Sequence, residues 1–269
     1  MQEQTSIMNT EKRFAFGENW GRFLGVVDAE RIDRAERSLQ DMLKLNDLDG
    51  KRFLDIGSGS GLFSLAARRL GAEVHSFDFD PLSVECTREL KDRHRKGDPH
   101  WTVEEGSVLN AEYLRSLGTF DIVYSWGVLH HTGALWQALQ NAALSVKEQG
   151  KLYIAIYNDQ GWISRYWQAV KKLYNENAIL RFGVIMIHFP YLFGMRYAVR
   201  LLSGRLKEER GMSIWHDMLD WLGGYPFEVA KPEEIISCCQ RMGLSLENLK
   251  TCGGRNGCNE FVFVKSGDA

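Results

Sequence analysis

The sequence has no excess of charge of one sign, few prolines and few cysteines. Its 269 residues include 33 basic and 35 acidic side chains, and the formal net charge is −2. This balance gives no electrostatic sign of polyanion binding. With 5 prolines there is no proline-rich linker, and a content of 44% hydrophobic and 25% charged residues is typical of a globular protein. A chain of this length can form one large α/β domain, or a core domain with a modest insertion.

The cysteines and the first residues of the sequence indicate in which cellular compartment the protein is expected. Cys252 and Cys258 are separated by five residues with no histidine nearby, which argues against a metal site, and the total of five cysteines is odd. We therefore expect free thiols in a reducing compartment. Residues 1–10 are polar and lead into Glu11, Lys12 and Arg13, so no secretory signal is expected and the location is predicted to be cytoplasmic.

Helical and strand-like patterns alternate over the first 158 residues. Strands are predicted at 52–56, 73–78, 101–105, 120–125 and 151–157, and helices at 30–45, 62–70, 82–95 and 134–146. After a helical stretch without strands, a helix at 232–243 and strands at 244–251 and 259–265 complete the pattern. This order predicts an α/β fold with a doubly wound, Rossmann-like, seven-stranded mixed sheet. Residues 1–158 (with a helical lead-in at 1–49) and 229–269 would form the core, and 159–228 a helical cap insertion.

A glycine-rich loop follows the first predicted strand. The loop has the spacing G-x-G-x-G at Gly57, Gly59 and Gly61, is preceded by Asp55 and leads into a helix. Its backbone N–H groups would therefore meet a ligand at close range. Dinucleotide-binding enzymes have G-x-G-x-x-G instead. Asp78 closes the next predicted strand, where a carboxylate suits two ribose hydroxyls.

Four segments in this order resemble the successive motifs of class I S-adenosylmethionine-dependent methyltransferases. They are residues 53–61, 74–78, 106–108 and 120–131. More narrowly, they are similar to the small-molecule methyltransferases grouped with ubiquinone- and menaquinone-pathway enzymes. The resemblance covers roughly residues 50–158 and 230–265.

The resemblance implies S-adenosyl-L-methionine as methyl donor and S-adenosyl-L-homocysteine as product. The loop of Gly57, Ser58, Gly59 and Gly61 would hold the methionine portion, with Asp55 before it and Asp78 on the ribose. Ser107 and Val108 would hold the adenine. Many relatives have Asp where Ser107 stands, so recognition there would rest on the backbone and a weaker hydroxyl contact.

Other aromatic and polar residues are candidates for cofactor contact. Phe79 would pack either on the adenine or in the core. Ser125 and Trp126 would line the amino-acid portion, and Trp20, with Phe14 and Phe16, would close the other side or pack in the core.

Acceptor chemistry is expected beyond the ends of the fourth and fifth strands. His130 and His131 are candidate bases because histidine titrates in the useful range, or they pack against the following helix. Tyr157, Asn158 and Asp159 would orient an acceptor, or form a turn in which Asp159 caps the next helix.

The segment 159–228 holds four of the eight tryptophans and an apolar run at 182–195 that is too short to span a bilayer. Three interpretations stay open: a cap over the active site, an interface for a homo-oligomer, or contact with a membrane or lipid-tailed substrate. His216, Asp217 and Asp220 would form a polar face that lines the pocket or is solvated.

The predicted function is therefore methyl transfer to an oxygen, sulfur or nitrogen nucleophile of a small molecule, without a nucleic-acid partner. An RNA- or tRNA-modifying methyltransferase and a non-catalytic cofactor-binding module are the alternatives. The basic cluster at 91–96 is expected to be the solvated end of a helix.

Overall fold

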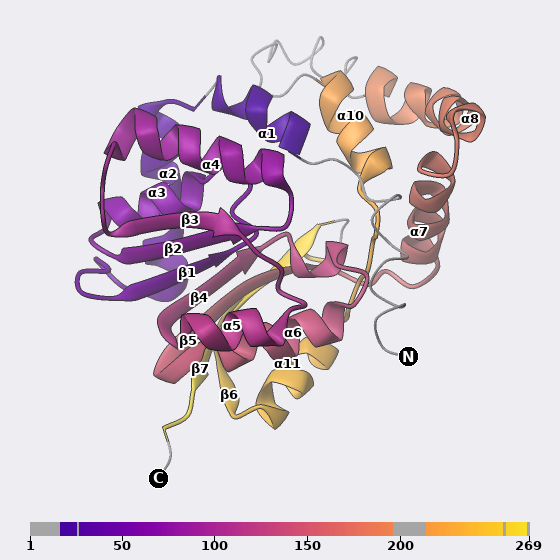
Figure 1. The fold of residues 1–269 in the computed structure, drawn as a ribbon. Helices are drawn as coiled ribbons and strands as arrows, with labels where there is room; N and C mark the ends of the chain where they lie inside the picture. The colour runs from indigo at the N-terminus through magenta and orange to yellow at the C-terminus, as the bar shows by residue number, and fades with distance from the viewer. Residues whose placement is uncertain (1–16, 26, 196–213, 255–256, 268–269) are drawn as a thin grey trace.

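The computed structural model describes residues 17–25, 27–195, 214–254 and 257–267, and these form a seven-stranded sheet with helices on both faces (Figure 1). The strand order is β3-β2-β1-β4-β5-β7-β6. All neighbours are parallel except β7, which is antiparallel to β5 and β6. The prediction of a doubly wound, mixed Rossmann-like sheet is confirmed. The strands are β1 Arg52–Ile56, β2 Glu73–Asp78, β3 Trp101–Glu105, β4 Phe120–Trp126, β5 Val146–Tyr157, β6 Leu244–Lys250 and β7 Cys258–Lys265.

Helices form one layer on each side of the sheet (Figure 1). Helices α2 (Ala29–Leu43), α3 (Leu62–Arg69) and α4 (Pro81–Arg95) cover one face. Helices α5 (Ala111–Leu117), α6 (Leu135–Leu144) and α11 (Pro232–Arg241) cover the other. Alternate residues of each strand enter the two resulting cores, as β1 shows: Phe53 packs on the α2–α3 side and Leu54 on the α6 side. The helix α5 is short, and the sequence pattern did not predict it.

Polar side chains mark where α2 and α4 begin. The Asp28 side chain accepts from the N–H of Arg31 at the start of α2, and Asp80 accepts from Leu82 N at the start of α4, where Pro81 is the first helical residue. The basic cluster at the end of α4 is mostly exposed, as expected.

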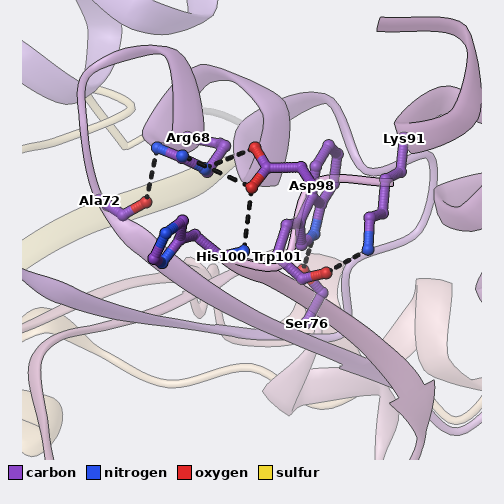
Figure 2. Close-up of polar contacts among 7 residues, drawn as sticks. All are labelled: Arg68, Ala72, Ser76, Lys91, Asp98, His100 and Trp101. Atoms are coloured by element: carbon purple, nitrogen blue, oxygen red, sulfur yellow. Dashed lines mark hydrogen bonds and ion pairs between the residues drawn. The ribbon is translucent and has the colours of Figure 1, made fainter. Parts of the chain in front are cut away.

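A polar network fixes β3 at the edge of the sheet (Figure 2). Asp98, in the turn before β3, accepts from Arg68 Nε of α3 at 2.8 Å and from the N–H of His100 at 2.9 Å. Lys91 Nζ of α4 donates to the Trp101 carbonyl, and the Trp101 indole N–H donates to Ser76 Oγ at 2.9 Å. These contacts connect the edge strand β3 to helices α3 and α4 and to Ser76 of β2.

Residues 159–228 contain helices that pack at one end of the sheet (Figure 1). They are α7 (Trp162–Tyr174), α8 (Ala178–Phe189), the π-helical turn η3 (Pro190–Met195) and α10 (Ile214–Gly223). They share a third hydrophobic cluster, which includes Trp167, Val184, Met218 and Phe227. Within the described part of the chain, every helix is too short or too polar to cross a membrane.

Candidate active site

The glycine loop lies where the strand order reverses, because the chain runs from β1 out to β3 and returns through β4 on the other side of β1. Open α/β sheets bind ligands beyond the strand ends at this position. The amides of Gly57 and Ser58 donate to the Phe77 carbonyl of β2 at 2.8 and 3.1 Å, which holds the loop against the neighbouring strand.

The three glycines of the loop are required by backbone conformation and by space. Gly57, Gly59 and Gly61 have φ of 79°, 55° and 77°, values that L side chains rarely adopt. A Cβ at Gly57 would lie 2.5 Å from Val128, and one at Gly61 would lie 2.9 Å from Thr87. No side chain caps the N-terminus of α3 that follows, so its first amides face the loop without an intrahelical acceptor. The loop thus forms a cradle of main chain that any side chain would fill, and it leads into the uncapped first amides of α3.

Asp78 stands beside this cradle at the end of β2. Its Oδ2 accepts from Gly59 N at 3.0 Å, and its Oδ1 accepts from Asp80 N at 2.9 Å. Burial raises the pKa of Asp78 to about 6, although the backbone hydrogen bonds oppose this shift. A carboxylate held against the glycine loop fits a diol donor such as a ribose. The glycine cradle and Asp78 therefore fit the methionine and ribose portions of S-adenosylmethionine.

Asp55 lies beneath the loop rather than on its open side. It is 2% exposed, and its Oδ2 accepts from Ser64 Oγ of α3 at 2.5 Å. Ser64 and Ser76 are hydrogen-bonded at 2.7 Å, which joins Asp55 to the Trp101 network of Figure 2. Burial raises the pKa of Asp55 to about 7. Asp55 thus ties the loop and the start of α3 to the sheet.

Two serines predicted to contact the cofactor make hydrogen bonds within the protein. Ser58 Oγ lies 2.9 Å from Thr87 Oγ1 of α4, and Ser125 Oγ donates to the Ile56 carbonyl at 3.1 Å. Both are buried, so these hydroxyls support the loop and join β4 to β1. A direct contact of either residue with the cofactor stays a prediction.

Helix α1 (Gly17–Leu24) carries Trp20 to the glycine loop. The Trp20 indole lies where a Cβ at Gly59 would be, with ring atoms 2.9–3.2 Å from that position. The N–H of Gly17 donates to Asp80 Oδ2 at 2.7 Å, and Arg93 of α4 donates to the Leu24 carbonyl at 2.8 Å. The helix is thus fixed to α4 at both ends. Phe14 and Phe16 lie outside the described residues.

The adenine candidates lie after β2 and β3. Phe79 is 51% exposed, so it is not a core residue. Val108 is buried in the core, and its carbonyl accepts from Asn141 Nδ2 at 2.8 Å, while Ser107 Oγ accepts from Leu109 N at 3.2 Å. Trp126, at the end of β4, is 41% exposed. Trp126 was predicted to line the amino-acid portion of the cofactor. Phe79 and Trp126 therefore both have exposed aromatic surface, whereas Val108 does not.

His130 and His131, in a 3-10 turn (η2, Leu129–His131) after β4, lie beside Tyr157 at the end of β5. The ring centroids of His130 and His131 are 4.2 and 5.7 Å from that of Tyr157. The structure therefore brings together the three residues that were predicted from the sequence to act at the acceptor site.

The two histidines differ in their surroundings. His130 is fully buried, its Nδ1 lies 3.4 Å from the N–H of Tyr157, and its Nε2 has no partner among the described residues. Burial holds the pKa of His130 well below its usual range. His131 is partly exposed, and its Nδ1 lies 2.6 Å from the Pro226 carbonyl, which can only accept. Nδ1 of His131 therefore carries the proton, and Nε2 is the basic nitrogen. Burial lowers the pKa of His131 to about 4, so its imidazole is neutral at neutral pH.

The segment 226–230 fastens the end of the insertion across β4 and β5. The Glu228 N–H donates to the His130 carbonyl at 2.9 Å, and the Ala230 N–H donates to the Tyr157 carbonyl at 3.0 Å. The Glu228 carboxylate accepts from Leu135 N, the first helical amide of α6, at 3.0 Å. Phe227 packs on Tyr157 with centroids 5.1 Å apart. The insertion is therefore joined directly to the predicted acceptor site.

Polar residues from the C-terminal strand complete the end of β5. Asn259 of β7 donates from Nδ2 to Asn158 Oδ1 at 3.0 Å, and Gln160 donates to the Gly254 carbonyl at 2.5 Å. Asn259 was not predicted as a site residue. It is buried and lies beside Glu260, just before the apolar run 261–264. Asp159 accepts from Gly161 N at 2.8 Å and forms a turn, and α7 begins without a side-chain cap. The prediction that Asp159 caps this helix is therefore wrong.

The side chains of His216, Asp217 and Asp220 lie outside the described residues, and their predicted pocket role stays open. Cys86, Cys238, Cys239 and Cys258 are free thiols, as expected. Among the residues that the structure describes, no group of three His, Cys, Asp or Glu side chains is placed to hold a metal ion.

A doubly wound sheet with a glycine cradle and an acidic residue at the end of β2 defines a nucleotide-cofactor-binding protein of the Rossmann-like class. A family model described as a methyltransferase domain matches residues 27–192, more than half of the chain, so the chain belongs to this family. The resemblance to class I methyltransferases is confirmed, and S-adenosylmethionine is the cofactor of the family, as predicted.

Curated methyltransferases are similar to the chain in sequence. The chain is 30% identical over 143 residues to the mitochondrial ubiquinone biosynthesis O-methyltransferase of Schizosaccharomyces pombe, covering 50% of this chain and 47% of that protein. It is 26% identical over 204 residues to the ubiquinone biosynthesis O-methyltransferase of Nitrosococcus oceani, covering 75% and 66%. The chain thus spans about half the length of several of the curated relatives it matches.

Solved structures share the fold. The magnesium protoporphyrin IX methyltransferase of Synechocystis, crystallised with S-adenosylhomocysteine, matches with a TM-score of 0.53 at 14% identity, covering 88% of this chain and 83% of that one.

Proposed function

We propose that the chain transfers a methyl group from S-adenosylmethionine to an oxygen, sulfur or nitrogen nucleophile of a small molecule. One observation carries the proposal: the glycine cradle with Asp78 lies at the same edge of the sheet as His131 and Tyr157. In-line methyl transfer needs a donor site and an acceptor site side by side, with the reactants aligned. The ubiquinone O-methyltransferases among the relatives support a small-molecule acceptor.

The donor site would be formed by the residues of the cradle and its neighbours. Bound S-adenosylmethionine supplies an electrophilic methyl group on a sulfonium. The glycine loop and the first amides of α3 would bind the methionine portion, with Trp126 lining it, and Asp78 would bind the ribose hydroxyls. Phe79 and the Ser107–Val108 backbone would hold the adenine. Trp20 would cover the site, and its ring would favour a positive charge beside it. Asp55, Ser58 and Ser125 would act through the loop that they support.

His131 is our proposed proton acceptor. Its Nδ1–H donates to the Pro226 carbonyl, which fixes the ring and leaves Nε2 as the basic nitrogen. Because the ring is neutral at neutral pH, Nε2 would be ready to take a proton from a hydroxyl, thiol or ammonium acceptor. His130 has no exposed surface and would position Tyr157 and the turn instead.

Residues 159–228 are proposed to form a cap over the acceptor, and 1–158 with 229–269 the core. Hydrogen bonds between 226–230 and His130, His131 and Tyr157 support a position of the cap over the ends of β4 and β5. Trp221 and Phe227 would shield the acceptor side from water, which favours attack on a sulfonium.

A binding measurement and an activity screen test the proposal. Calorimetry with S-adenosylmethionine and S-adenosylhomocysteine should show binding that Asp78→Ala weakens strongly. A screen of phenols, thiols, amines and small acids should then find an acceptor-dependent release of S-adenosylhomocysteine. Absence of binding to both compounds would refute the donor site. Binding without turnover on any acceptor class would favour a non-catalytic module.

A further inference from the structure

Exposed apolar side chains are concentrated on the insertion. Of fifteen large hydrophobic side chains that are exposed in the described part of the chain, nine lie between Trp162 and Tyr191. Single exposed hydrophobic residues are normal on a protein surface, but a contiguous group marks an interaction site. Figure 1 places α7 and α8, which carry most of the group, at the outer edge of the molecule.

Helix α8 presents the main part of this group. Ile179, Phe182, Met186 and Ile187, which we term the α8 face, are 85%, 65%, 58% and 74% exposed. Successive members are three, four and one residues apart, so they lie on one side of the helix. Val184 and His188 occupy the opposite side and are buried in the cluster of the insertion.

The orientation of α8 is fixed by hydrogen bonds on its buried side. His188 Nδ1 lies 2.7 Å from the Val184 carbonyl, and His188 Nε2 lies 2.7 Å from the Tyr166 hydroxyl of α7. A rotation that buried the α8 face would break the contact with Tyr166 and bring a polar ring into solvent. The exposure of the α8 face is therefore a stable property of the packed helices.

The charge of this region is positive, whereas the chain as a whole has a net charge of −2. From Trp162 to Met195 the basic residues are Arg165, Lys171, Lys172 and Arg181, and the one acidic residue is Glu176. Arg165, Lys172 and Arg181 are exposed, and Arg181 lies next to Phe182 of the α8 face. The sequence then contains no acidic residue before Glu208.

We propose that the α8 face docks on the surface of an anionic lipid bilayer. The apolar side chains would enter the boundary between head groups and acyl chains, and Arg181 and Lys172 would meet the anionic head groups. A second copy of the chain fits less well, because a two-fold contact through α8 would bring Arg181 of one copy towards Arg181 of the other without an acidic residue on the helix to compensate. A bilayer matches both the apolar face and the positive charge.

Docking in this way would place the cap beside the lipid. α8 shares its hydrophobic cluster with Phe227, which packs on Tyr157 at the proposed acceptor site. An acceptor with an apolar tail would then reach the site from the bilayer through the cap. The bilayer contact itself does not depend on the proposed methyl transfer.

Vesicle sedimentation tests the proposal. The full chain is mixed with vesicles of phosphatidylcholine alone, or of phosphatidylcholine with phosphatidylglycerol. We expect binding to the anionic vesicles that salt weakens, and little binding to the neutral ones. Replacing two exposed anchors, as in Phe182→Ser with Ile187→Ser, should reduce the partition coefficient roughly tenfold or more. Arg181→Gln should reduce it less.

Leu144→Ser is the matched control, because Leu144 is 51% exposed on α6, outside the insertion, and its replacement should leave vesicle binding unchanged. Retained cofactor affinity, or an unchanged circular dichroism spectrum, shows that the variants are folded. The proposal is overturned if the wild-type chain does not bind anionic vesicles, or if the double variant binds as the wild type does. Light scattering that shows a dimer dissociated by the double variant, with no vesicle binding, would assign the face to self-association. Vesicle binding by a chain without affinity for S-adenosylmethionine would refute the proposed function alone.

Discussion

His130 and His131 are adjacent residues of one type, and their surroundings give them different properties. His130 is enclosed on all sides, whereas His131 is partly exposed and has one ring nitrogen fixed by the Pro226 carbonyl. The basic nitrogen of His131 is thus defined by a backbone atom 95 positions later in the chain. The hydrogen bond to the Pro226 carbonyl cannot be predicted from the sequence of the His-His pair.

His131→Gln should lower kcat by roughly a hundredfold or more with an acceptor that must lose a proton, because general-base catalysis contributes about that much. In the wild type, the lowered pKa means that kcat/KM rises with pH through about 4 and is level above pH 6. His94 is an exposed histidine on α4, and the control substitution His94→Gln should leave kcat and its pH profile unchanged. A steady-state pH profile measures both effects. Full activity in His131→Gln would show that no side-chain base acts at this position.

Asp55→Asn should stabilise the protein at pH 8 and have little effect at pH 4. The folded-state pKa of about 7 lies above the usual aspartate pKa of 3.8, so the folded state binds the proton more tightly. Stability from this group is present below pH 4 and is lost as the pH rises to about 7. Asn keeps the shape and can accept from Ser64 without the buried charge, so we expect a gain of about 2 kcal/mol or more at pH 8. Urea denaturation at both pH values measures it, and a loss of stability at pH 8 would contradict the argument. Asp92→Asn, on the exposed face of α4, should show no such pH dependence.

At the scale of elements, Asp80 joins the proposed ribose site to helix α1. Its backbone N–H donates to Asp78, while its carboxylate accepts from the amides of Leu82 and Gly17. Trp20 reaches the glycine loop from the same helix. The position of α1 is therefore tied to the residue that would bind the cofactor.

Asp80→Ala should weaken the binding of S-adenosylhomocysteine several-fold and cost about 1 kcal/mol of stability, the usual loss for a helix cap. Asp28→Ala removes a comparable cap from α2, far from the glycine loop, and should cost similar stability without changing affinity. Calorimetry and thermal denaturation of both variants separate the two effects. Equal affinities in the two variants would show that α1 does not contribute to binding.

Glu228 anchors the insertion to the core through the N-terminus of α6, which has no side-chain cap of its own. Glu228→Gln removes a negative charge from a helix N-terminus and should destabilise the protein by about 0.5–1 kcal/mol. Glu233→Gln, in the exposed first turn of α11, is the matched comparison and should cost less. The unfolding midpoint in urea measures the difference.

Most elements of the core could be predicted from the sequence, because alternating apolar patterns, Gly and Pro mark them directly. The helix α2 and six of the seven strands lie close to their predicted positions, whereas β5 begins at Val146, five residues before the predicted start. The short helix α5 was missed because seven residues carry too little periodicity. The glycine loop and Asp78 were found because each is local in sequence. Asn259, Pro226 and Glu228 reach the site from distant segments, and no local pattern reports such contacts.

For the whole molecule, cofactor binding should be visible as stabilisation. The proposed donor site joins β1, β2, α1 and α3, so a ligand that binds the folded chain alone raises its free energy of unfolding. At a hundred times the dissociation constant the gain is about 2.7 kcal/mol. For a domain of this size we expect S-adenosylhomocysteine to raise Tm by roughly 5–10 °C. Thermal denaturation measures this shift, which should be absent in Asp78→Ala and with adenine alone. A wild-type Tm that does not change would contradict the site.

The position of β7 between β5 and β6 determines when the site can be completed during synthesis. β6 pairs with β7 alone, and β7 supplies Asn259 to Asn158 at the end of β5. While the ribosome is still adding residues 251–265, the nascent chain can already assemble the five parallel strands and the glycine loop. The proposed donor half can therefore form on the emerging chain, whereas the proposed acceptor half is completed only when the last strand has left the exit tunnel.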